Sequence, residues 1–420
     1  MPTLTAGSAR QARGSERSVG FVILVGSLTL LPALATDMYL PSLPEVAGEM
    51  GTTDAAVQFT ITGMLIGGAI GQLIVGPFSD RVGRRRPVMI GVGLHALMSL
   101  LCALAVTIEQ LQALRVLQGL ASAGATVVAM AIIRDRYTGS EAARLMSRLV
   151  LVIAVAPLFA PTIGGVIADA WGWRAVFVAL ALLAGVLLAV VAVALPETLP
   201  AERRAAHGLG ALAHGYVGIL RDRRFVALAV VPGFGMAVIM AYVSGSPFVL
   251  RDEYGLTAQQ FSLAFAIGGT ALVLGSQLNA ALVRRVGPMR LLRFGAPATT
   301  VLTAVLVVVA ATRAGGVVGF IAALWLSLSL LGLVLGNASA LALSRHGERA
   351  GTAAATLGFI QTALAGAVSP LVGVLGGGAL AMTGVMLGSM VAATLVLALA
   401  TPAYRRGGWL EPIGPPVGTH

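Results

Sequence analysis

Residues 76–87 decide how this chain folds, and they read Gly-Pro-Phe-Ser-Asp-Arg-Val-Gly-Arg-Arg-Arg-Pro. This charged turn, which glycine interrupts, follows one apolar run, 55–75, and precedes another, 88–106. At about 1.5 Å per residue, each run is long enough to cross a hydrocarbon core about 30 Å thick. A short cationic hairpin between two such runs predicts two membrane spans that are joined at one face of the membrane.

The composition is typical of a protein embedded in a membrane. Of the 420 residues, 57% are hydrophobic and only 11% are charged, whereas a soluble domain carries about a quarter charged residues. The 53 glycines favour close packing of helices in lipid, where no hydrophobic force draws helices together. We therefore expect a helical protein that crosses the membrane many times.

Apolar runs predict an all-α membrane protein with twelve transmembrane helices. The predicted spans are residues 19–40, 55–76, 88–107, 110–133, 143–168, 174–195, 225–248, 258–282, 291–311, 316–341, 350–373 and 380–400. All 28 basic residues are arginines, and 24 of them fall before the first span, after the last, or in the connections after even-numbered spans and the first residues of the spans that follow. The positive-inside rule then places both termini in the cytoplasm. Because the net charge of +11 is spread over alternate connections, it does not indicate a nucleic-acid-binding face.

The longest polar interruption separates six spans from six and predicts two six-helix bundles. The expected divisions are a cytoplasmic tail (1–18), an N-terminal bundle (19–195), a cytoplasmic loop (196–224), a C-terminal bundle (225–400) and a second cytoplasmic tail (401–420). The motif around Gly71 and Arg81-Val82-Gly83 recurs 204 residues later as Gly275 and Arg285-Val286-Gly287. Two such repeats place a binding site at their interface, near the midplane of the membrane.

The connection between spans 2 and 3 resembles the signature of the major facilitator superfamily. The matching residues are Gly76, Asp80, Arg81, Gly83, Arg84 and Arg85. In that family this connection is a cytoplasmic lock between the two halves, so the resemblance implies a gating role here. The alternative, anchoring of arginines at the inner membrane face, explains the basic cluster but leaves Asp80 and the glycines unexplained.

Span 4 contains Arg115-Val116-Leu117-Gln118-Gly119, which resembles the R-x-x-Q-G motif of the same family. An arginine within an apolar helix costs about 2.5–3.5 kcal/mol unless it is solvated or paired. Asp37, at a matching depth in span 1, is the candidate counter-charge. Burial and a nearby arginine act in opposite directions on carboxyl protonation, as exchange of a substrate for H⁺ requires. The alternatives are an Arg115 that reaches the outer interface and a solvated Asp37, and the sequence leaves open whether the two touch.

Span 5 resembles the antiporter motif of the superfamily, with alanine in place of glycine at positions 156 and 160. The matching residues are Pro157, Pro161, Gly164 and Gly165. The closer resemblance is to the twelve-span drug:proton antiporters of the Bcr/CflA type. It is carried by Thr36-Asp37-Met38-Tyr39-Leu40-Pro41 after span 1, Ile133-Arg134-Asp135 after span 4 and Pro196-Glu197-Thr198 after span 6. This resemblance implies proton-coupled export of drugs.

These observations predict a proton-coupled secondary transporter in the bacterial inner membrane. It would export small amphipathic drugs such as phenicols by alternating access, with Asp37 and Arg115 coupling transport to protons. Tyr39, Gln118 and Asn337 are candidates for contact with substrate in the cavity. The alternatives are proton-linked uptake, export of an endogenous metabolite, or a receptor that does not transport. We expect a monomer with no enzymatic activity, cofactor or metal, and the absence of a P-loop sequence argues against ATP as the energy source.

Overall fold

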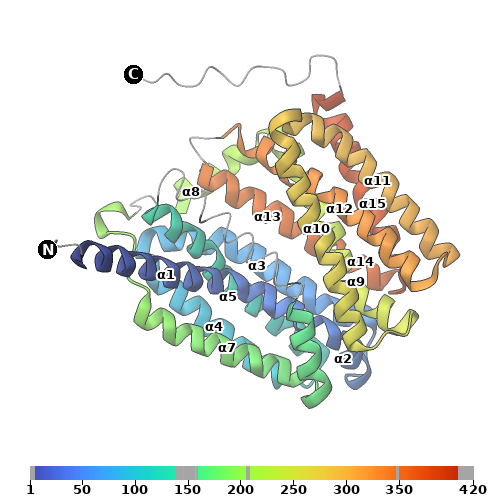
Figure 1. The fold of residues 1–420 in the computed structure, drawn as a ribbon, viewed down its shortest axis with the longest axis horizontal. Helices are drawn as coiled ribbons and strands as arrows, with labels where there is room; N and C mark the ends of the chain where they lie inside the picture. Colours follow the sequence, from blue (N-terminus) through green and yellow to red (C-terminus); the bar gives the residue numbers. More distant parts are fainter. Residues whose placement is uncertain are drawn as a thin grey trace. The chain divides into compact units, whose positions relative to one another are not determined.

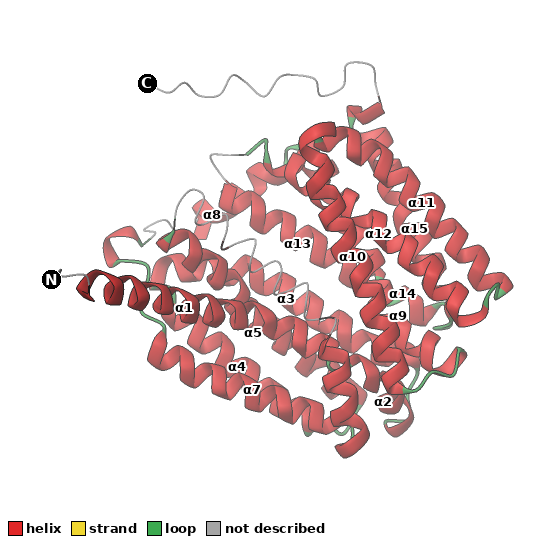
Figure 2. Cartoon of the chain, in the orientation of Figure 1, coloured by secondary structure: helices red, strands yellow, loops and turns green. Residues whose placement is uncertain are grey.

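The computed structural model describes residues 5–137, 145, 157, 159–204, 209–346 and 350–404. Every regular element among them is a helix, and Figure 1 and Figure 2 follow these helices along the chain. The α-helices are α1 (Thr5–Asp37), α2 (Leu43–Glu49), α3 (Asp54–Val82), α4 (Arg85–Ala103), α5 (Ile108–Arg136), α7 (Trp173–Ala194), α8 (Leu209–Leu220), α9 (Arg223–Pro247), α10 (Ala258–Val286), α11 (Pro288–Thr312), α12 (Gly316–Leu343), α13 (Ala350–Val368), α14 (Leu371–Val374) and α15 (Ala379–Ala400). Residues 159–171 are also helical.

Within the described residues, eleven helical segments are long and apolar enough to cross a membrane. They overlap eleven of the twelve predicted spans, so the all-helical membrane fold is confirmed. The remaining predicted span, 143–168, lies largely outside the described residues. The number twelve and the cytoplasmic location of both termini therefore stay predictions.

The chain forms two compact units. The first consists of Met1–Leu212 and Val243–Gly269, and the second of Ala213–Tyr242 and Thr270–His420. The end of α9 and the start of α10 belong with the first unit, and the division into two six-helix bundles stays a prediction. The predicted cytoplasmic loop also contains a helix, α8.

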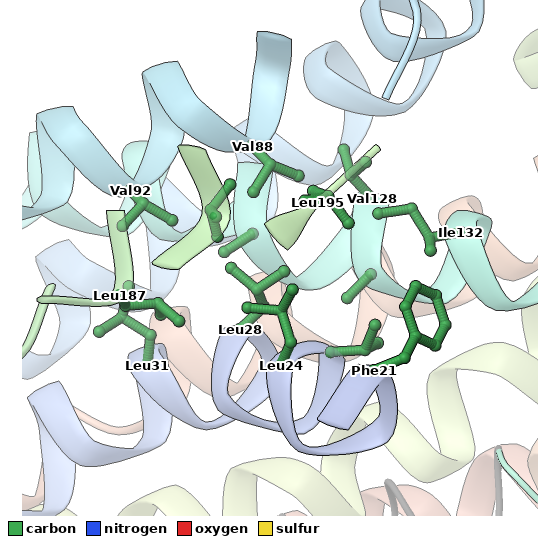
Figure 3. Close-up of a cluster of buried hydrophobic side chains, with 14 of the residues drawn as sticks. Phe21, Leu24, Leu28, Leu31, Val88, Val92, Val128, Ile132, Leu187 and Leu195 are labelled. Carbon is green, nitrogen blue, oxygen red and sulfur yellow. The ribbon is translucent and has the colours of Figure 1, made fainter. Parts of the chain in front are cut away.

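In the first unit, helices α1, α4, α5 and α7 contribute to one apolar core (Figure 3). Its labelled residues are Phe21, Leu24, Leu28, Leu31, Val88, Val92, Val128, Ile132, Leu187 and Leu195. Beside this core, α3 packs along α5 so closely that a Cβ atom on Gly67 would lie 1.9 Å from the carbonyl oxygen of Val116. This is the close helix packing that the glycine content predicts.

Helix lengths repeat between the two halves of the sequence. Helices α3 and α10 each have 29 residues, and both their first and last residues are 204 positions apart. Each is followed by a glycine with positive φ, 97° at Gly83 and 86° at Gly287. In the second half, Pro288 begins the next helix, at a position where its fixed φ is favourable.

Candidate functional site

Asp37 is the last residue of α1, at a break in the first membrane span. After it the chain turns through a 3₁₀ turn, Leu40–Ser42, and continues as α2. Pro41 lies at the start of the 3₁₀ turn, where its missing N–H costs no helical hydrogen bond. The Asp37 side chain is buried, with 7% exposure. Among the described residues, no group donates a hydrogen bond to its carboxylate.

Arg115 is fully buried on α5, and α1 supplies much of its surroundings. Its Nη1 atom donates to the carbonyl oxygen of Ala35 at 3.0 Å and to Oε1 of Gln118 at 2.6 Å. The guanidinium carbon lies 5.2 Å from the ring centroid of Tyr39 and 5.6 Å from that of Phe177. Cation–π attraction of this kind partly replaces the solvation that a buried cation loses.

No ion pair within the described residues joins Asp37 to Arg115. Arg115 instead contacts the first span through the backbone carbonyl of Ala35 and the ring of Tyr39, which follows the end of α1. In this structure, two oxygen acceptors at Nη1 and the rings of Tyr39 and Phe177 are the partners of the arginine.

The three candidate cavity residues are all buried between helices. Besides its contact with Arg115, Tyr39 accepts a hydrogen bond from Thr60 at 3.4 Å. Gln118 lies between Arg115 and Ser99. In the second unit, Nδ2 of Asn337 donates to Oδ1 of Asn279 at 2.7 Å. All three side chains use protein partners here, and their contact with substrate stays a prediction.

The connection between α3 and α4 is built around the buried side chain of Arg84. Its Nη1 atom donates to Asp80 at 2.5 Å and to Ser79 at 2.8 Å, and its Nε atom donates to Asp135 at 2.7 Å. Burial lowers the pKa of the Arg84 guanidinium, but hydrogen bonds to Asp135 and Asp80 outweigh this effect and raise it overall. The connection between α3 and α4 and the stretch of the family resemblance that contains Asp135 therefore meet at one arginine.

Glu197, after α7, caps the start of α4. Its carboxylate accepts from the backbone N–H groups of Arg84 at 2.8 Å and Arg85 at 3.3 Å, which have no acceptor within the helix. It also accepts from the N–H groups of Thr198 and Leu199. Burial raises the pKa of Glu197, but these four donors outweigh it, and the pKa lies below its usual value. In the sequence, Glu197 is part of the family stretch Pro196-Glu197-Thr198, but the sequence does not indicate that it binds the start of α4.

Gly83 is the position in this connection that requires glycine. Its φ of 97° is rare for any residue with a side chain, and a Cβ atom there would lie 2.3 Å from Oε2 of Glu197. The other predicted residues have simpler surroundings. Gly76 lies within α3, Arg81 lies in its last turn, and Nη2 of Arg85 donates to the carbonyl oxygen of Ala192 at 2.5 Å.

The helix at residues 159–171 contacts the break in the first span. A Cβ atom on Gly164 would lie 1.9 Å from the carbonyl oxygen of Met38, whereas one on Gly165 would meet nothing nearer than 3.6 Å. Pro161 is buried within this helix, and Pro157 is also helical. Position 156, where alanine replaces the glycine of the motif, lies outside the described residues.

Two further contacts involve residues that follow α9, one with the break in the first span and one with the helix at residues 159–171. Arg251 donates to the carbonyl oxygen of Pro41, and Gln259 donates to Asp169 at 2.8 Å. Sequence reasoning missed these contacts. One feature of the sequence could have drawn attention to Arg251: it is one of three arginines on the predicted outer side, where few arginines are expected.

No group of three or more His, Cys, Asp or Glu side chains within the described part of the chain is arranged to hold a metal ion. A bundle of apolar helices that buries an acid and an arginine is instead typical of membrane transporters. A model of the Major Facilitator Superfamily matches residues 25–370. The chain therefore belongs to this superfamily of transporters.

Three relatives place the chain more closely. It is 38% identical over 363 residues to an uncharacterized MFS-type transporter, YdgK, of Bacillus subtilis (strain 168), covering 86% of this chain and 90% of the relative. It is 30% identical to a bicyclomycin resistance protein homolog of Haemophilus influenzae, covering 84% and 88%. A chloramphenicol resistance protein of Pseudomonas aeruginosa is also 30% identical, with 84% and 83% covered. The predicted resemblance to drug efflux transporters of the superfamily is confirmed.

Proposed function

We propose that this protein exports small amphipathic drugs of the phenicol type across the bacterial plasma membrane in exchange for protons. The observation that carries the proposal is Asp37, a buried carboxyl group to which no residue in the described part of the chain donates a hydrogen bond, at a break in a membrane-spanning helix. Ionisable residues inside membrane segments are costly and are typical of proton pathways. Relatives named for resistance to bicyclomycin and chloramphenicol support drugs as the substrate class.

Export by antiport is energetically reasonable. Inward movement of one proton charge releases about 2.3 kcal/mol per 100 mV of membrane potential, in addition to any pH gradient. In alternating access, Asp37 would take up a proton from the outer side and release it to the cytoplasm, and drug would move in the opposite direction. The Arg84 network would hold the cytoplasmic ends together while the protein is open to the outside. One chain would be the transport unit, with both termini in the cytoplasm.

The test is flux of radiolabelled chloramphenicol in proteoliposomes under an imposed pH gradient. We expect drug to move against the proton gradient in the wild-type protein, and Asp37→Asn to abolish the response to pH. The matched control is Asp54→Asn, which removes a partly buried acid in the first turn of α3 and should keep the response.

Three results would contradict the proposal. The first is drug flux that ignores the pH gradient, and the second is an Asp37→Asn variant with normal proton coupling. The third is accumulation of drug along an inward proton gradient, which would identify uptake instead of export.

A further inference from the structure

A closed set of hydrogen bonds lies between α4 and α5, one helical turn from Arg115. Nε2 of Gln118 donates to Oγ of Ser99 at 2.7 Å, and Ser99 donates to the carbonyl oxygen of His95 at 2.8 Å. His95 Nδ1 lies 2.7 Å from Oγ of Ser122, which donates to the carbonyl oxygen of Gln118 at 2.7 Å. All four side chains are at most 2% exposed.

Ser99 holds the end of the Gln118 amide that faces away from Arg115. An amide has a donor end and an acceptor end, and Arg115 needs the acceptor, Oε1, at 2.6 Å. The donor end then requires an acceptor of its own, because a buried polar group without a partner is destabilising. The Ser99 hydroxyl has already given its proton to the backbone of His95, so its oxygen is available to accept from Nε2. Arg115 cannot substitute for Ser99, since it has only donors.

We propose that Ser99 is a positioning residue for Arg115. By holding the donor end of the Gln118 amide in place, it keeps the guanidinium against Ala35 and Tyr39 of the segment that carries Asp37. Ser99 acts through Gln118 and touches neither Arg115 nor Asp37 by a hydrogen bond. This inference rests on the proposed function wherever it concerns transport. The contact itself does not depend on that function.

Other charged and titratable groups near Arg115 could also change the pH dependence of transport. His95 and Cys102 on α4 and Tyr39 after α1 interact with it electrostatically. A Ser99→Ala variant leaves all three in place. A change in the pH dependence of transport in this variant would therefore be caused by movement of the Gln118 amide.

The first measurement needs no substrate and uses thermal unfolding of the purified full-length protein in detergent. We expect the Ser99→Ala/Gln118→Ala double variant to lose no more Tm than Gln118→Ala alone, because Ser99 stabilises the protein through that amide. Losses of Tm that simply add would overturn the proposal.

The second measurement is the pH profile of chloramphenicol flux in proteoliposomes. Ser99→Ala should reduce coupled flux about tenfold, the factor expected for one lost hydrogen bond to the partner of a charged group, and should shift the profile as Gln118→Ala does. Ser99→Thr, which keeps the hydroxyl, should restore the wild-type profile. A lowered Tm with an unchanged profile would reduce Ser99 to a structural role and overturn the proposal.

The matched control is Ser389→Ala. Ser389 is also a buried serine that donates to the carbonyl oxygen four residues earlier, Val385, at 2.8 Å, but it accepts from no glutamine. It should leave the pH profile unchanged, and an equal shift in this control would contradict a specific role for Ser99. Wild-type protein without chloramphenicol flux would contradict the proposed function, and the unfolding measurement would still decide whether Ser99 positions Gln118.

Discussion

At the residue scale, two features of the structure favour glycine at position 83: a positive φ and a carboxylate close to the backbone. The sequence motif alone does not tell them apart. The φ of Gly83 is positive, as at Gly287, but only Gly83 faces a carboxylate, whereas a Cβ atom on Gly287 would meet nothing within 4 Å. We expect Gly287→Ala to cost about 1–3 kcal/mol, the range for a strained backbone. Gly83→Ala should cost more because Glu197 must also move. Thermal unfolding of both variants checks the order, and equal losses would contradict a role for Glu197.

Glu197 itself gives a prediction with a definite sign. Because its pKa is lowered in the folded protein, its contribution to stability is fully present above its unfolded pKa of about 4.3 and is lost as pH falls through the lower folded value. Glu197→Gln should therefore reduce the loss of Tm between pH 5 and pH 3, measured in detergent. Glu202→Gln, at an exposed glutamate nearby, is the control. A Glu197→Gln variant with the wild-type slope would contradict the capping role.

At the scale of elements, the helix at residues 159–171 contacts the break after α1. We therefore expect substitution of Gly164 by alanine to be tolerated less well than substitution of Gly165. A methyl group at Gly164 would collide with the Met38 backbone, whereas one at Gly165 has room. Gly164→Ala should displace the segment next to Asp37 and reduce proton-coupled chloramphenicol flux more than tenfold, while Gly165→Ala stays near wild type. The measurement is flux per amount of folded protein, and equal effects of the two substitutions would contradict this packing.

The same scale shows what the sequence predicts and what it does not. Hydropathy located the eleven described spans because it depends on local composition. The motif repeated at a 204-residue offset predicted two related halves, and α3 and α10 begin and end at that same offset. The partner of Arg115 depends on how the first span is rotated about its own axis, which an apolar pattern on nearly all sides does not fix. The contact between Arg251 and Pro41 joins residues 210 positions apart, and no local pattern specifies it. Ser99 was missed because a single serine in an apolar helix carries no motif.

At the scale of the whole molecule, cysteine labelling can test the number of crossings. Cys102 is the single cysteine in the sequence and is buried, so Cys102→Ala gives a background without reactive thiols. Into it we would introduce Thr52→Cys and Ala314→Cys, in connections predicted to lie outside, and Glu202→Cys and Ser344→Cys, predicted to lie inside. Each variant is treated in intact cells with a maleimide that does not cross membranes, and again after permeabilisation.

If residues 143–168 form a span, positions 52 and 314 are labelled in intact cells, and positions 202 and 344 are labelled only after permeabilisation. If that segment does not cross, every connection after it changes side. Position 202 would then be labelled in intact cells, as position 52 is, and position 314 would be protected. That pattern would contradict twelve crossings. It would also conflict with the 24 arginines assigned to the cytoplasmic side, since most of those in the second half would then lie outside.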